Sequence, residues 1–279
     1  MITLVRIELY KIFKKWRTYI GFIAIAVLVP VIEVAMLLEG ARSLNFMTRN
    51  LQQSFVFVGN LLNGYLVSYI ILNALTIHIP FLIALVAGDL LAGEATAGTY
   101  RMLVTRPISR FKIVSSKFIA GAIYTNLLVL WLAIFSLVLG LIMFGIGELI
   151  VIRSSTIIIF SREDVFWRFI LGYGFAALSM MVVTSLAFLF SSLVENAIGP
   201  IVTTMAIIIV FIIISAINID FFQNIKPYLF TTYMQSWRLF FDKPVDFYEI
   251  IKSAFILAGH IIVFFGATLI IFKRKDILT

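Results

Sequence analysis

Six long apolar blocks dominate this sequence, and each is close to the ~20 residues that a helix needs to cross a bilayer. They cover about residues 18–38, 60–87, 118–147, 168–190, 198–219 and 250–272. Backbone polar groups inside a bilayer must be paired within the segment, so we expect helices there. The second and third blocks exceed ~25 residues, so we expect them to tilt or to run past the membrane.

The composition indicates an integral membrane protein. Hydrophobic residues make up 62% of the 279 residues and charged residues 13%, whereas a soluble domain has roughly 25% charged residues. The chain has no cysteine, which excludes disulfides, iron–sulfur clusters and thiolate zinc sites within it. The net charge of +8 is typical of cytoplasmic loops that face anionic lipid. We therefore expect one all-α transmembrane domain over residues 1–279.

Residues 1–17 form a basic stretch. The first two spans follow it, within residues 18–87. On a helix, one stripe of this stretch would hold the apolar residues Ile2, Val5, Leu9, Ile12, Phe13 and Trp16. This spacing is that of a surface helix. We expect the helix to lie in the inner membrane interface, with Trp16 at headgroup depth. The alternative is a positively charged start that only sets the orientation of the chain.

Two segments between the spans are polar or aromatic enough to lie outside the hydrocarbon core. The segment 148–167 is apolar in its middle but carries four charged side chains beyond its first residue, and we interpret it as an outer loop or interfacial element. The segment 220–249 has the composition of an interfacial aromatic belt, and a pair of short re-entrant helices fits there if protein shields them. The density of lysine and arginine favours both termini in the cytoplasm, with residues 273–279 as a tail.

The sequence shows no motif for catalysis or metal binding. A G-x-x-x-x-G-K-[ST] run for nucleotide phosphates is absent, and so are H-E-x-x-H and G-x-S-x-G. His78 and His260 fall in different spans, and we interpret each as a hydrogen-bonded structural residue. We therefore expect no catalytic site, no metal site and no cofactor bound by this chain.

Glu33 is the most unusual single charge in the spans. It lies three residues after Pro30, toward the outer end of the first block, where snorkelling to the interface lowers the cost of burial. Placement at the interface is the interpretation that we favour. The alternative is a position in the path of a substrate or an ion.

The longest polar segment on its side of the membrane, residues 88–117, lies between the second and third blocks. It holds five basic residues and two acids, with glycines at positions 88, 93 and 98. Those glycines divide what would otherwise be short helical pieces, and Pro107 ends the last of them. A segment of this kind is either a solvated connector or a docking surface, and the pattern alone fits both.

Part of this segment resembles a family signature. The run resembles the G-E-x-x-x-G-T…R-P-[IV]-S-R…K pattern of type-2 ABC exporter permeases, which lies between the second and third membrane helices in that family. The matching residues are Gly93, Glu94, Gly98, Thr99, Arg101, Arg106, Pro107, Ile108, Ser109, Arg110 and Lys117. The basic N-terminal stretch is also similar to the start of such permeases. The resemblance touches the whole chain but is specific only at residues 93–117.

The resemblance implies the permease subunit of an ATP-driven exporter in a bacterial inner membrane. Residues 93–110 would form a cytoplasmic coupling helix seated on a separate ATPase subunit, which would bind the ATP and Mg²⁺. Glu94, Arg101 and Arg106 would contact this ATPase, and the N-terminal helix would brace the coupling helix. The chain would pair with a second permease subunit, identical or related. The substrate would be amphipathic or hydrophobic, such as a lipid, a peptide antibiotic or a drug.

An ATP-independent, ion-coupled carrier is the competing class. Such a carrier should have acidic residues in the middle of its spans, whereas Glu33 and Asp89 fall near the ends of theirs. An intramembrane enzyme is a third class, and it would need a cluster of His, Asp or Glu that the sequence does not bring together. No nucleic-acid partner is expected.

Overall fold

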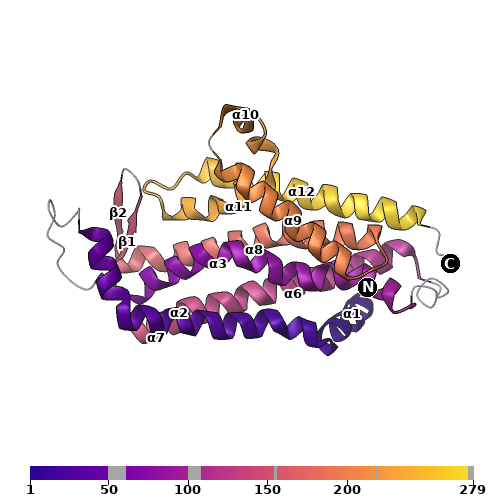
Figure 1. The fold of residues 1–279 in the computed structure, drawn as a ribbon, viewed down its shortest axis with the longest axis horizontal. Helices are drawn as coiled ribbons and strands as arrows, with labels where there is room; N and C mark the ends of the chain where they lie inside the picture. The colour runs from indigo at the N-terminus through magenta and orange to yellow at the C-terminus, as the bar shows by residue number, and fades with distance from the viewer. Residues whose placement is uncertain (50–60, 100–107, 154–155, 218, 276–279) are drawn as a thin grey trace.

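The computed structural model describes residues 1–49, 61–99, 108–153, 156–217 and 219–275. Figure 1 shows an elongated bundle of long helices that run side by side. The N-terminus and helix α1 (Ile2–Lys14) lie at one end of the bundle, and a β-hairpin lies at the opposite end. We call these the α1 end and the hairpin end.

Six helices in the described part of the chain are long and apolar enough to cross a membrane, which confirms the predicted number of spans. They are Trp16–Phe46, Gly64–Thr96, Arg110–Phe144, Arg162–Leu193, Ile198–Ala216 and Phe247–Arg274. Several of them are longer than the predicted blocks. The chain is therefore a mostly helical protein of the multi-pass membrane type.

These long helices are built from the following elements. The first half holds α2 (Trp16–Thr48), α3 (Gly64–Ala87), α4 (Asp89–Thr96), α6 (Arg110–Ala133), the π-helix η2 (Ile134–Leu139) and α7 (Gly140–Phe144). The second half holds α8 (Arg162–Leu193), α9 (Ile198–Ala216), α10 (Asp220–Gln223), α11 (Phe230–Met234) and α12 (Phe247–Arg274), with the short 3₁₀-helices η3 (Lys226–Tyr228) and η4 (Gln235–Phe241).

The segment predicted as an outer loop, 148–167, contains the hairpin. Strand β1 (Leu149–Ile152) pairs antiparallel with β2 (Ile157–Phe160), with Leu149 opposite Phe160. Asn63 attaches this hairpin to the bundle: its Oδ1 accepts from the amide of Leu66 at the start of α3, 3.1 Å away, and its Nδ2 donates to the carbonyl of Glu148 at 2.8 Å. The expected all-α fold is therefore corrected to a mostly helical fold with one two-stranded hairpin.

The aromatic residues of 220–249 occupy the interior as well as the surface. Trp237, Phe230 and Phe241 are fully buried, and η4 packs against α8. An interfacial belt would leave these rings at the surface, so the belt interpretation is wrong for these three side chains. In place of the expected pair of short re-entrant helices, this segment has four short helices, α10, η3, α11 and η4.

Helix α8 is the centre of the bundle. It packs against α3, α4, α6, α9, α12 and η4. At the hairpin end the helices approach closely where α3 begins: a Cβ added to Gly64 would lie 2.6 Å from the Cα of Leu141 in α7. A side chain larger than hydrogen does not fit there, because such a contact is far shorter than a van der Waals distance.

The predicted N-terminal helix exists, but its apolar stripe packs partly on the protein. Ile12 is buried, and Leu9 and Phe13 pack against the core, while Val5 is half-buried. Lys15 has an extended backbone conformation and separates α1 from α2, so Trp16 starts the next helix and is exposed. The structure therefore does not have a lipid-facing stripe that includes all of these residues.

Candidate functional site: the charged junction at the α1 end

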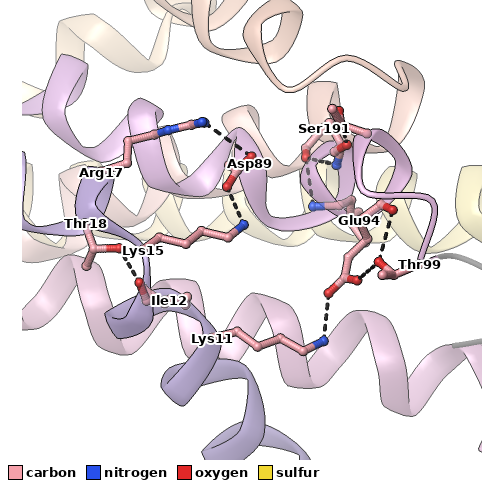
Figure 2. A network of polar contacts seen from close by, with 12 residues as sticks. Lys11, Ile12, Lys15, Arg17, Thr18, Asp89, Glu94, Thr99 and Ser191 are labelled. Carbon is pink, nitrogen blue, oxygen red and sulfur yellow. Dashed lines mark hydrogen bonds and ion pairs between the residues drawn. The ribbon is translucent and has the colours of Figure 1, made fainter. Parts of the chain in front are cut away.

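Glu94 is the centre of a group of ion pairs that joins α4 to α1 and α6. Its Oε1 lies 2.8 Å from Nζ of Lys11 in α1 and 2.8 Å from Nζ of Lys117 in α6. Its Oε2 accepts a hydrogen bond from the hydroxyl of Thr99. Figure 2 shows the Glu94 side chain reaching from α4 toward Lys11. The Glu94 side chain is 12% exposed, so it lies inside the junction.

Glu8 completes the group. Its Oε2 lies 2.7 Å from Nζ of Lys117, and its Oε1 lies 3.1 Å from Nζ of Lys11. We call Glu8, Lys11, Glu94 and Lys117 the Glu94 cluster. Lys117 is 2% exposed, and a buried ammonium needs compensating carboxylates, because an unpaired buried charge costs several kcal/mol. The two acids and two lysines of the cluster balance one another.

The electrostatics of the cluster are visible at Lys11. Burial alone would lower the pKa of its ammonium, but the hydrogen bond that Lys11 donates to Glu94 and the negative charges of Glu8 and Glu94 outweigh burial and raise the pKa. A raised pKa means that the charged form is favoured in the folded chain. The cluster therefore keeps Lys11 positively charged.

Asp89 forms a second ion-paired group one turn away, at the start of α4. Its Oδ2 lies 2.6 Å from Nζ of Lys15, and its Oδ1 lies 3.3 Å from Nη1 of Arg17, as Figure 2 shows. A Cβ on Gly93 would lie 2.5 Å from Oδ1 of Asp89. The glycine at 93 therefore leaves room for the carboxylate. A cavity of about 270 Å³ lies between these two groups of charges and is lined by both.

Helix α4 is also attached to α8. The Oγ of Ser191 accepts hydrogen bonds from the backbone amides of Leu91 and Ala92, at 3.0 and 2.9 Å. These amides are in the first turn of α4, where backbone donors have no partner inside the helix. The hydroxyl of Thr96 donates to the carbonyl of Glu195 at 2.8 Å. Contacts from α4 therefore reach α1, α2, α6 and α8.

The remaining predicted residues of the segment fall into two groups. Gly98 ends α4 with a φ of +65°, a conformation that glycine adopts at no steric cost. Arg110 donates from Nη1 to the carbonyls of Phe272, Lys273 and Lys275, at 3.1, 2.9 and 2.9 Å. A cation at the C-terminal end of a helix is stabilising. The predicted contact residues Arg101, Arg106 and Pro107 lie outside the described residues.

The charges at Glu94 and Arg110 are thus paired within the chain. From the sequence we expected Glu94 to contact a separate ATPase. Lys11 and Lys117 were placed in the N-terminal stretch and in the family signature, not beside Glu94. The signal that was available is Glu8, an acid among the basic residues of the N-terminal stretch. Its position three residues before Lys11 is the spacing of a helical ion pair.

Both histidines have the structural contacts that were expected. Nδ1 of His78 lies 3.0 Å from the carbonyl of Ala74, and Nδ1 of His260 lies 2.8 Å from the carbonyl of Ile256. In the described part of the chain, no group of three or more His, Cys, Asp or Glu residues is placed to hold a metal ion.

Glu33 lies far from this junction, toward the hairpin end, and its surroundings differ from those expected. Its side chain is fully buried, and neither carboxyl oxygen has a hydrogen-bond partner among the described residues. A side chain that reached the interface by snorkelling would be exposed. Glu33 is therefore buried within the bundle and does not reach its surface as the interface placement requires.

Comparison with known proteins places the chain in a family. A family described as "Protein of unknown function (DUF2705)" matches residues 22–278. The uncharacterized protein YhcI of Bacillus subtilis (strain 168) is 33% identical over 141 residues, which make up 48% of this chain and 44% of YhcI. The match thus spans less than half of that relative. Because the family match extends over nearly the whole sequence, the chain belongs to the DUF2705 family.

Proposed function

We propose that this chain is the membrane subunit of an ATP-driven exporter of the type-2 ABC class. The observation that carries the proposal is the run from Gly93 to Lys117, which resembles the coupling segment of such permeases. Its described residues lie at the α1 end, at the end of the second long helix and the start of the third. ATP and Mg²⁺ would bind to a separate ATPase subunit, and this chain would carry out no catalysis.

The contacts of α4 support a coupling role in physical terms. A force applied to residues 93–110 would reach α6 through Lys117, α1 through Lys11 and α8 through Ser191. Closely packed, hydrogen-bonded elements of this kind move together, because packed interfaces do not deform continuously. Closure of the ATPase would in this way shift the spans between two states that differ in affinity for the substrate.

The assembly would contain two permease chains and two ATPases. Helices α2, α9 and α12 leave large apolar side chains exposed, among them Leu38, Ile213 and Phe255. Lipid or a second permease chain would cover these faces. The transported molecule would be amphipathic or hydrophobic, in keeping with a pathway through apolar spans.

The test is co-expression of the full chain with the proposed ATPase partner, to be sought as a P-loop ATPase in a neighbouring reading frame. We expect the chain alone to hydrolyse no ATP, and the two proteins to co-purify as an active ATPase. Arg106→Glu should lower co-purification and ATP hydrolysis, since charge reversal adds repulsion and removes attraction. The matched control is Arg162→Glu, which reverses an exposed charge at the hairpin end. If Arg106→Glu and its control both bind and hydrolyse at the native rate, the coupling role is wrong.

The proposed orientation places the α1 end in the cytoplasm, and single cysteines test it. The chain has no cysteine of its own, so a cysteine at Ser109 or at Ser161 can be labelled without background. Both serines are exposed, at opposite ends of the bundle. An impermeant thiol reagent applied to intact cells should label position 161 and spare 109. The reverse pattern would mean that the chain lies inverted in the membrane.

An ion-coupled carrier is the second candidate, and the burial of Glu33 favours it. Carriers of this class hold acidic side chains inside the protein at membrane depth, and Glu33 is such a side chain. The two candidates differ in their energy source. Export that continues without the ATPase and stops when the proton or sodium gradient is collapsed would support the carrier.

A further inference from the structure

Glu33 of α2 lies beside Gly140 of α7 and the start of α3, near the hairpin end. A Cβ built on Gly140 of α7 would lie 3.3 Å from Oε1 of Glu33, 3.1 Å from Oγ of Ser68 and 3.4 Å from the carbonyl oxygen of Gly64. The lack of a side chain at Gly140 thus leaves the space that the carboxyl group occupies.

The π-helix η2 contributes to the same place. The hydroxyl of Ser68 lies 2.6 Å from the carbonyl of Ser136 in η2, and the hydroxyl of Ser136 lies 2.6 Å from that of Tyr173. π-Helical turns shift the backbone hydrogen-bond register and occur often at functional sites. Ser68, Ser136 and Tyr173 therefore form a line of polar contacts beside Glu33, in which Ser68 is joined to Ser136 through a backbone carbonyl and Ser136 is joined to Tyr173 through their hydroxyls.

The carboxyl group of Glu33 is separate from this line in the present conformation. Both of its oxygens are buried without a hydrogen-bond partner among the described residues. The surrounding helices offer no compensating cation in the described residues: η2 and α7 have no ionisable side chain. The three basic residues of α6, Arg110, Lys112 and Lys117, lie in its first turns, at the α1 end, and His78 of α3 is bonded to Ala74. Helix α8 carries Arg162, Glu163, Asp164 and Arg168 in its first two turns, and the guanidinium of buried Arg168 is bonded to Asp164 and to the carbonyls of Phe240 and Asp242. The other ionisable groups on α3, α6 and α8 are tyrosines: Tyr65, Tyr69, Tyr124 and Tyr173.

The depth of Glu33 makes an ionised form costly. It follows Trp16 by 17 residues, which is about 25 Å along a helix, within the ~30 Å of a bilayer core. An isolated ionised carboxylate in such surroundings takes up a proton instead, because the neutral form does not carry the cost of desolvation. Since the two oxygens are closed off even from water, a proton is the ligand that fits beside them.

We propose that Glu33 is a proton-binding site inside the membrane domain, which holds a proton in this packing and exchanges it when α2 separates from η2 and α7. The hydroxyl of Ser68, which lies beside the same glycine as the carboxyl group, would be the polar group that Glu33 meets when these helices separate. The site does not depend on the ATP-driven mechanism proposed above, because it rests on the surroundings of one side chain.

Infrared spectroscopy of the full chain in lipid tests this site. With glutamate labelled by carbon-13 at its carboxyl group, we expect a band of protonated carboxylic acid that persists at about pH 7, where exposed glutamates are ionised. The band should vanish in Glu33→Gln. It should shift after transfer to heavy water, because the proton exchanges. Glu39→Gln is the matched control: it removes an exposed glutamate from the same helix and should leave the band in place.

A second variant keeps the test decisive if Glu33→Gln does not fold. Glu33→Asp retains an acid but replaces a labelled side chain by an unlabelled one, so the labelled band should again be lost. Absence of the band in the unaltered chain would overturn the proposal. So would a band that remains in both variants, and so would a band that does not move in heavy water.

Discussion

Glu94 and Glu33 are acidic side chains of this bundle whose surroundings are opposite. Glu94, at the α1 end, has two lysines within 2.8 Å and a hydroxyl donor. Glu33, toward the hairpin end, has no hydrogen-bond partner in the described part of the chain. Burial alone therefore does not tell what an acid does. A paired carboxylate holds helices together, whereas an unpaired one is a place for a ligand.

The two ends of the bundle also differ in the kind of polar contact that joins their helices. At the α1 end the contacts are ion pairs between elements far apart in sequence, such as Lys11 and Glu94. Near Glu33 the contacts are hydroxyl groups bonded to backbone carbonyls, such as Ser68 to Ser136. The first arrangement depends on charge and the second on close backbone packing.

The largest effect should come from Lys117→Met. This change leaves Glu8 and Glu94 buried beside each other with Lys11 as the remaining cation, and breaking a buried ion pair costs about 3–5 kcal/mol. Unfolding of the purified chain in detergent, followed by intrinsic fluorescence, should show a marked loss of stability. Lys112→Met is the control on the same helix, where the side chain is exposed. Equal losses in the two variants would contradict the compensating role of Lys117.

The most direct comparison is the same substitution at the two acids. Glu94→Gln should lower the free energy of unfolding by about 1.5–3 kcal/mol, since it removes hydrogen bonds from charged groups. Glu33→Gln should cause no loss, because the carboxyl group has no partner to lose. The same detergent unfolding assay measures both. A loss at Glu33 as large as that at Glu94 would show that Glu33 has a structural partner.

Glu94 is consequently a poorer probe of docking than the sequence suggests. We expected its replacement to leave the membrane domain intact, because it lies outside lipid. Its pairing with Lys11 and Lys117 means that a change there loosens α1 and α6 as well. An effect on transport from Glu94→Ala would therefore mix coupling with stability, whereas Arg106→Glu has the matched control given above.

The smallest effect concerns pH. Because the pKa of Lys11 is raised in the folded chain, its ion pairs add stability below its unfolded pKa of about 10.4, and this contribution is lost as the pH rises through the folded pKa. The loss should be below about 1 kcal/mol, since the side chain is partly exposed to solvent. Lys11→Arg keeps its charge at high pH and should remove this part of the alkaline destabilisation. Identical alkaline unfolding curves for Lys11→Arg and for the unaltered chain would contradict this contribution of Lys11.

The sequence predicted the spans well because hydropathy is a local property of about 20 residues. It also marked Gly98, where α4 ends with a positive φ, but Gly93 lies inside α4 and leaves room for Asp89 instead of dividing the helix. The partners of Glu94 could not be predicted, because Lys11 lies 83 residues away and chain position says little about such a contact. The burial of Glu33 depends on Gly140, in another span. Hydropathy assigns a depth to a residue but not the side of the helix that neighbours cover.

The bonds from Arg110 to the last carbonyls of α12 have a practical consequence for experiments. They hold the C-terminal end of α12 beside the start of α6, and the N-terminus lies at the same end of the bundle. An affinity tag or a fluorescent protein fused to either terminus would therefore stand next to residues 93–110 and could block a protein that binds there. An epitope inserted in the turn between β1 and β2 would be displayed at the far end and would leave that surface clear.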